Sequence, residues 1–165
     1  MTPELSRPEM SRVVAVDRLP ATLMVAATPE ERAALATRLH IPEVRVLTCR
    51  WTLRRQGTMV EAQGTLEAEV VQSCVVSLEP VEQHVSDRFT VRFVPAGKEK
   101  DHEDPEAPDE LPYEGSSIDL GEAAAEQLAL ALDPYPRHPD AELDPAALEP
   151  EPTGFGVLAA LRPKP

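Results

Sequence analysis

The feature that most constrains the fold is a regular alternation of apolar and polar residues through the middle of the chain. In the run Phe89-Thr90-Val91-Arg92-Phe93 the three apolar side chains fall on one face and Arg92 on the other. Residues 64–71 repeat the pattern, with Leu66, Ala68 and Val70 on one side. Such alternation is typical of strands with one buried face, so the sequence predicts a sheet that is covered on one side.

Turn signals divide this region into strands. We predict strands at residues 44–48, 51–53, 58–71 and 85–94. Gln56-Gly57 and the run Ser77 to Pro80 are the natural turns, so consecutive strands should pair antiparallel. Two shorter strands, 11–18 and 22–27, precede them.

Two helices are predicted from their start and stop signals. Thr28 can cap the first, with Pro29 at its first position and Glu31 reciprocating, and the helix should run to about His40. Asp119 can cap the second, with Glu122 reciprocating, within 116–135. Its expected apolar stripe is Leu120, Ala124, Leu128 and Ala131.

The charge is unevenly distributed along the 165 residues. The net charge is −13, but residues 1–95 carry 11 arginines and 12 acids, whereas residues 96–165 carry five bases and 17 acids. Residues 96–115 are acidic and contain several prolines, which predicts a disordered, flexible loop or solvated spacer. Residues 136–165 read as a Pro-rich tail, with a short terminal helix at 155–161.

These elements predict a single α+β domain over 1–165. Its β-rich part with one helix covers 11–95, and its antiparallel sheet is of a kind that can curl into a partly open barrel. The two cysteines, the lack of a long apolar stretch and the polar N-terminus predict a cytosolic protein that does not contact membranes. The acidity argues against a global grip on nucleic acid, and DNA is not an expected partner.

The sequence offers little for catalysis or cofactors. The four histidines, His40, His84, His102 and His138, lie near no recognisable nucleophile motif, and each is expected at the surface. Cys49 and Cys74 stand alone, without the paired spacing of a zinc site, and Cys74 is expected to be a small buried residue. No Gly-rich phosphate loop is present. We therefore expect no catalytic residues, metal or cofactor, and a protein that is not an enzyme.

One cluster in the β-rich part could contact RNA. It comprises Arg45, Arg50, Trp51, Arg54 and Arg55. Guanidinium groups could bind phosphates and the indole could stack on a base. The alternative is an exposed strand face with Trp51 in the core.

Three ordered motifs resemble the YceD-like family of large-ribosomal-RNA accumulation proteins. The first runs from Gly64 to Val81 and contains Cys74, Leu78, Glu79 and Pro80. The second begins at Ile118 and ends in Asp133, Pro134, Tyr135, Pro136 and Arg137. The third is Phe155 to Leu161. Many relatives carry Cys-x-x-Cys where this chain has Val71 to Cys74, so the resemblance does not imply a zinc site here.

The resemblance implies a role in the synthesis, processing or stability of 23S ribosomal RNA, without implying a mechanism. We expect an accessory factor that binds the pre-50S particle or ribosomal proteins, whose basic charge complements the acidic segments. The alternative is a module that binds ribosomal RNA directly through the arginines. The sequence leaves the oligomeric state open.

Overall fold

The computed structural model describes residues 8–100 and 105–143. Its elements, in chain order, are β1 (Val13–Ala15), the 3-10 turn η1 (Val16–Arg18), β2 (Thr22–Ala26), α1 (Pro29–Leu39), β3 (Glu43–Gln56), β4 (Met59–Ser73), β5 (Pro80–Pro95), β6 (Asp109–Tyr113), β7 (Ser117–Asp119) and α2 (Leu120–Ala131).

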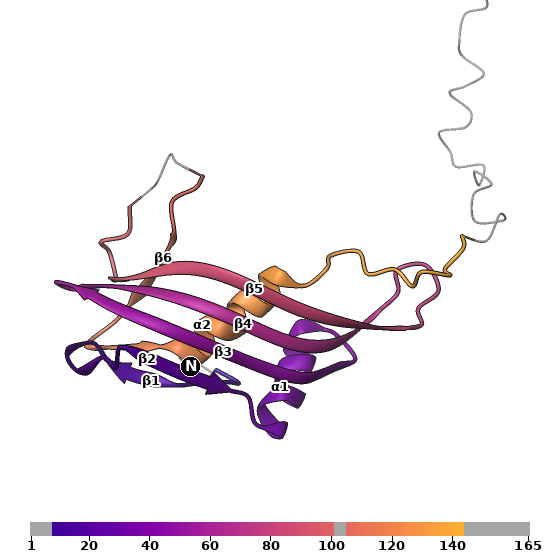
Figure 1. The fold of residues 1–165 in the computed structure, drawn as a ribbon, viewed down its shortest axis with the longest axis horizontal. Helices are drawn as coiled ribbons and strands as arrows, with labels where there is room; N and C mark the ends of the chain where they lie inside the picture. Colours follow the sequence, from indigo (N-terminus) through magenta and orange to yellow (C-terminus); the bar gives the residue numbers. More distant parts are fainter. Residues whose placement is uncertain (1–7, 101–104, 144–165) are drawn as a thin grey trace, which may run out of the picture.

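Five strands form one sheet in the order β2-β3-β4-β5-β6. Neighbours from β2 to β5 pair antiparallel, as predicted, while β6 pairs parallel with β5. A second, two-stranded sheet joins β1 to β7. Figure 1 shows the three long strands β3, β4 and β5 side by side, with α2 crossing them. The α+β class is confirmed, and within the described residues the sheet stays open and does not close into a barrel.

The long strands follow from uninterrupted alternation. The segments predicted as separate strands, 44–48 and 51–53, are parts of the single strand β3, because buried Cys49 continues the inward series between them. A register shift between Val44 and Val46 bends its beginning. Gly57, with φ of +63°, makes the turn to β4, a conformation that a glycine adopts without strain.

One core lies between the sheet and the helices. The inward faces of β3, β4 and β5 pack with buried residues of α1 and α2 in a single apolar cluster. The predicted alternation is confirmed for Leu66, Ala68 and Val70, but Val71, predicted on the opposite face, is buried as well. The core is thus formed by the inner face of the long strands together with one face of each helix.

Helix α1 begins as predicted. The Glu31 N–H donates to the Thr28 hydroxyl, and the Thr28 N–H donates to the Glu31 carboxylate. The helix ends at Leu39, and His40 follows in a left-handed conformation with φ of 55°. Leu35 and Ala36 are buried, so this helix covers the sheet through one face.

Helix α2 is shorter than the predicted 116–135, because residues 117–119 form β7 and the helix ends at Ala131. Asp119 caps it as predicted, accepting the N–H groups of Gly121 and Glu122. The Glu122 carboxylate does not reciprocate, since it accepts two hydrogen bonds from Arg38 of α1 at 2.8 and 2.9 Å. Glu122 therefore joins the two helices.

Three other predicted segments differ from the structure or lie outside the residues that it describes. The flexible loop predicted over 96–115 is wrong for 109–113, which form β6 because Leu111 and Tyr113 pack against the core. The strand predicted at 11–18 is reduced to β1, and η1 follows it. The terminal helix predicted at 155–161 lies outside the described residues.

Candidate functional site

Two motif segments that are distant in sequence meet where β4 ends, β5 begins and α2 stops. The first is the turn 74–80 and the second is the stretch 133–138 that follows α2. We call this region the motif junction. Sequence reasoning singled out both segments but not their contact, because the contact depends on where α2 ends relative to the sheet.

The first segment is a tight turn built around Cys74. The Cys74 N–H donates to the Glu79 carbonyl at 2.8 Å, and the Leu78 N–H donates to the Cys74 carbonyl at 3.0 Å. Leu78 has φ of +62°, in the left-handed region. For a bulky residue without glycine's freedom, such a conformation costs roughly 1–3 kcal/mol.

The second segment is fastened to this turn by backbone groups. The Val75 N–H donates to the Pro136 carbonyl at 2.8 Å, and Gln72 Nε2 donates to the Asp133 carbonyl at 2.9 Å. The Tyr135 N–H donates to Asp133 Oδ1 at 2.9 Å. The stretch 133–136 that follows α2 is thus held in one geometry against the end of β4.

The Cys74 thiol lies at the centre of the motif junction and is fully buried, which confirms its predicted burial. Its Sγ accepts N–H groups from His138 at 3.3 Å and from Val76 and Ser77 at 3.4 Å. These donors favour the thiolate, so the pKa of Cys74 is lowered to about 6, with the His138 N–H as the largest cause. By contrast, burial raises the pKa of Cys49 to about 12.

The surface of the motif junction carries large apolar side chains. Leu78 is 78% exposed and Tyr135 is 75% exposed, and Val75 and Leu130 are also exposed. Beside them is a hollow of about 520 Å³. It lies between the ends of α1 and α2 and the last residues of β4, and its lining includes Leu130, Pro134 and Pro136.

Gln72 supplies an unsatisfied polar atom to the lining of this hollow. The residue is 6% exposed, and its Oε1 has no hydrogen-bond partner among the described residues. A buried acceptor without a partner costs about 1–3 kcal/mol. The motif junction therefore combines exposed apolar side chains, a strained Leu78 and an unused acceptor.

The structure separates the five members of the Arg/Trp cluster. Trp51 is fully buried on the inner face of β3, edge-on to Phe89, whereas Arg50 and Arg54 are exposed on the outer face. Arg45 lies at the register shift and is ion-paired with Glu43 and Glu82. Arg55 donates to the Gly57 carbonyl at the end of the strand. The alternative interpretation, with Trp51 in the core, matches this arrangement.

The histidines occupy unrelated positions. His84 on β5 contacts Glu67, and His138 accepts the N–H of Asp140. His102 lies outside the described residues. Within residues 8–100 and 105–143, no group of three or more His, Cys, Asp or Glu side chains is placed to hold a metal ion. In the same part of the chain, neither helix is long and apolar enough to cross a membrane.

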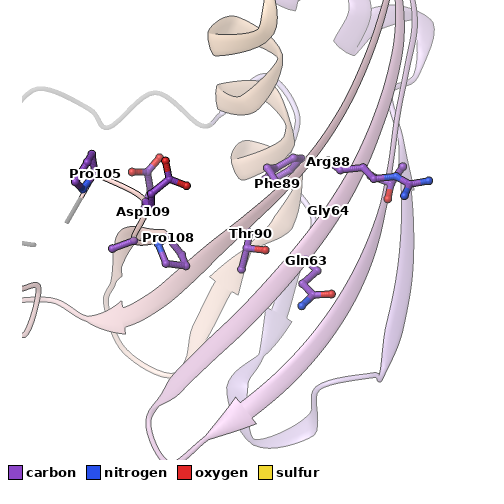
Figure 2. A pocket seen from close by; sticks show the side chains of 11 residues that line it. Gln63, Gly64, Arg88, Phe89, Thr90, Pro105, Pro108 and Asp109 are labelled. Atoms are coloured by element: carbon purple, nitrogen blue, oxygen red, sulfur yellow. The ribbon is translucent and has the colours of Figure 1, made fainter.

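A second hollow lies beside the middle of β4 and β5. It has a volume of about 660 Å³, and Figure 2 shows Gln63 and Thr90 on one side with Pro105, Pro108 and Asp109 on the other. The acidic segment that leads into β6 thus stands beside the middle of β4 and β5.

Comparison with known families gives one match. The model of the family described as large ribosomal RNA subunit accumulation protein YceD matches residues 62–154, more than half of the chain. The chain belongs to the YceD family. No curated protein and no solved structure matches the chain significantly.

Membership in the YceD family supports a role in ribosome biogenesis and in the accumulation of large-subunit RNA. The matched region begins at residue 62, so it contains both segments of the motif junction and leaves out the arginines of β3. Leu130 and Gln72 line the hollow beside the motif junction, and neither was singled out from the sequence. A leucine in a predicted helix and a glutamine just after a predicted strand carry no signal until the fold places them together.

Proposed function

We propose that this YceD-family chain supports 23S rRNA accumulation as an accessory factor in the cytoplasm that binds the precursor of the large subunit. Binding uses a protein contact at the motif junction, and the chain catalyses no reaction of its own. The direct partner is a ribosomal protein on the precursor particle.

The exposure of Leu78 is the observation that carries this proposal. A leucine with 78% of its surface in solvent contributes little to the core, and its left-handed backbone is costly. Both features are typical of a side chain that is positioned to contact a partner protein. Tyr135 and Val75 of the motif junction are exposed as well, and so is Leu130 near the end of α2. Clustered exposed apolar residues mark interaction sites.

The charges around the motif junction indicate the chemistry of the partner. Glu79, Asp133 and Asp140 are exposed there, and residues 96–165 carry most of the negative charge. A basic protein segment with apolar side chains would therefore be attracted and then held by apolar contact. Ribosomal proteins offer such segments.

Sedimentation tests the proposal. Extract from cells expressing the chain is fractionated on a sucrose gradient, and we expect the wild type to travel with large-subunit precursors. Leu78→Ala combined with Tyr135→Ser should shift it to the top fractions, because both side chains are exposed and their loss leaves the core intact. The control is Val13→Ser, 62% exposed on β1, which should sediment as wild type. Free wild-type protein, or equal behaviour of the variant and the wild type, would refute the proposed contact.

A pull-down measures how much the charge of the acidic segment contributes to binding of ribosomal proteins. Replacing Asp101, Glu103 and Asp104 by their amides should weaken capture of purified ribosomal proteins, most clearly at low salt. Because surface charges act mainly on encounter, the loss should be partial and should vanish at high salt. Unchanged capture of ribosomal proteins at low salt would show that the acidic segment does not contribute to binding. The apolar contact at the motif junction is tested separately by sedimentation.

A further inference from the structure

The sheet has a face that no helix covers in the described part of the chain. Both helices pack against the inner residues of the long strands, as members of one apolar cluster. The residues between these inner positions therefore point outward. On β3 they include Arg50, Thr52 and Arg54.

Strand register arranges the outer residues in rows across β3, β4 and β5. The first row is Arg50, Thr65 and Arg88. The second is Thr52, Gln63 and Thr90. The third is Arg54, Glu61 and Arg92. Because one strand separates Arg50 from Arg88, their backbones stand about 9–10 Å apart at the usual strand spacing.

Three arginines of this face have no partner among the described residues. Arg50, Arg54 and Arg88 are exposed and make no hydrogen bond or ion pair there. In Figure 2 the Arg88 side chain extends to the opposite side from Asp109. We call these three residues the arginine triad.

Some other arginines of the chain are paired with carboxylates. Arg12 contacts Glu31, and Arg38 contacts Glu122. On the outer face itself, Arg92 lies 3.7 Å from Glu61. Arg18, Arg32 and Arg137 also lack a carboxylate partner among the described residues, so the triad is set apart by the grouping of its arginines on one face of the sheet.

Carboxylates also lie near the triad: Glu61 is the cross-strand neighbour of Arg54, and Glu106 and Asp109 line the same hollow as Arg88. Glu61 faces Arg92, and Glu67 contacts His84 and Ser86. Glu69, further along β4 toward the motif junction, is exposed and has no partner among the described residues. The strand residues of the outer face are therefore mainly basic in the half that includes Arg50, Arg54 and Arg88, with the acidic segment 105–109 beside Arg88, and acidic toward the motif junction.

Between the arginines lie neutral polar side chains that can donate and accept hydrogen bonds. Thr52, Gln63, Thr65 and Thr90 occupy this floor. Aromatic rings are absent from these rows, because Trp51 and Phe89 point inward to the core. The face therefore lacks a stacking platform, and it offers charge and hydrogen bonds without a means of reading bases.

We propose that the arginine triad and its polar floor bind the sugar-phosphate backbone of large-subunit rRNA without base specificity. The inference deepens the proposed function and rests on it, since it gives the same particle a second contact. Unpaired guanidiniums in a fixed array suit phosphate oxygens, and the Thr and Gln groups suit phosphate and 2′-hydroxyl groups. The protein contact and the RNA contact then lie on different surfaces of the chain.

The test is a titration of full-length protein against a labelled fragment of large-subunit rRNA at several salt concentrations. The double variant Arg50→Gln with Arg88→Gln should lose roughly tenfold in affinity at low salt. Its slope of log affinity against log salt should fall by about two units, one for each phosphate contact. The matched control, Arg18→Gln with Lys98→Gln, removes the same charge from exposed basic side chains outside the triad and the motif junction and should retain the wild-type slope.

Five outcomes bear on the proposal. Loss confined to the triad variant supports it, as does retention of the slope in Arg50→Lys with Arg88→Lys, which keeps the charge. Equal loss in the control variant would overturn it, since net charge alone would then explain binding. Wild-type protein that binds anionic lipid vesicles but not RNA would overturn it as well. If RNA binding is absent while the wild type still sediments with precursor particles, this inference fails and the proposed function stands.

Discussion

The indole of Trp51 and the ring of Phe89 meet edge to face across Gly64, with ring centroids 5.2 Å apart and an interplanar angle of 87°. The three residues are cross-strand neighbours on β3, β4 and β5. Because Gly64 has no side chain, the two rings can close over the middle strand. The row behind them, on the outer face, is Arg50, Thr65 and Arg88, so the aromatic pair also fixes the register of the proposed RNA contact.

Gly64→Ala should lower the free energy of unfolding by about 2–3 kcal/mol. A Cβ on Gly64 would overlap with the Phe89 ring at Cζ, so the ring must move and the core is overpacked. Urea denaturation measures the loss, and Gln63→Ala on the exposed face should change stability by less than about 0.5 kcal/mol. Adding Phe89→Leu should cost less in the Gly64→Ala background than alone, and strict additivity would contradict the contact.

Leu78→Gly should raise the free energy of unfolding by about 0.5–1 kcal/mol. Glycine relieves the left-handed strain at φ of +62°, part of which is offset by the greater freedom of glycine in the unfolded chain. Leu78→Ala keeps the strain and loses an exposed side chain, so its thermal midpoint should stay near that of wild type. Both variants should weaken particle binding. A glycine variant that is no more stable than the alanine variant would show that the turn is unstrained.

The stability of the folded chain should depend on pH through Cys74. Its pKa is lowered from 9.0 to about 6 in the folded state by backbone and hydroxyl donors. A depressed pKa stabilises the fold fully above the unfolded value, and the gain is lost as pH falls toward 6. The difference in unfolding free energy between wild type and Cys74→Ala should therefore grow from pH 6 to pH 9.

Ultraviolet absorbance of the thiolate checks the same group directly. One thiol should titrate near pH 6 in the folded protein and disappear in Cys74→Ala. Cys49, whose pKa is raised to about 12 by burial, should not titrate below pH 9 and serves as the internal control. A single step near pH 8 to 9 in the folded wild type would contradict the hydrogen-bonded thiolate.

Asp119→Ala should cost about 2–3 kcal/mol, more than an ordinary helix cap. Oδ1 of Asp119 accepts the N–H groups of Arg12, Gly121 and Glu122, and Oδ2 accepts the Ser11 hydroxyl. The carboxylate thus holds the N-terminal segment and α2 together. Asp119→Asn keeps Oδ1 as an acceptor and should lose less than half as much in chemical denaturation. Equal losses in the two variants would mean that the backbone donors contribute little.

Local sequence rules predicted several parts of this fold because the interactions concerned are local. The capping box at Thr28 and Glu31 spans three residues, and the turn at Gly57 needs one left-handed position. The alternation around Phe93 likewise encodes a buried face without reference to the rest of the chain.

The parts that escaped prediction depend on partners distant in sequence. Glu122 pairs with Arg38 instead of its own helix terminus, which a local capping rule cannot foresee. The strand β6 forms in an acidic segment because Leu111 and Tyr113 reach the core beside β5.

The candidate site follows the same division. Cys74 and Pro136 could be singled out from motifs, but the hydrogen bond from the Val75 N–H to the Pro136 carbonyl, which joins the two segments, depends on the fold. Arg88 lies 38 positions after Arg50 in the chain and becomes its neighbour in the outer row through the register of three strands alone.

The proposed function predicts that the exposed surface of the motif junction, and not an enzymatic activity, supports accumulation of large-subunit RNA. Its most direct test is the ratio of 23S to 16S rRNA in cells depleted of the chain and complemented with variants. Wild type and Val13→Ser should restore the ratio, while Leu78→Gly should fail to restore it despite its greater stability. Full restoration by Leu78→Gly combined with Tyr135→Ser, or a ratio that does not change on depletion, would contradict the account.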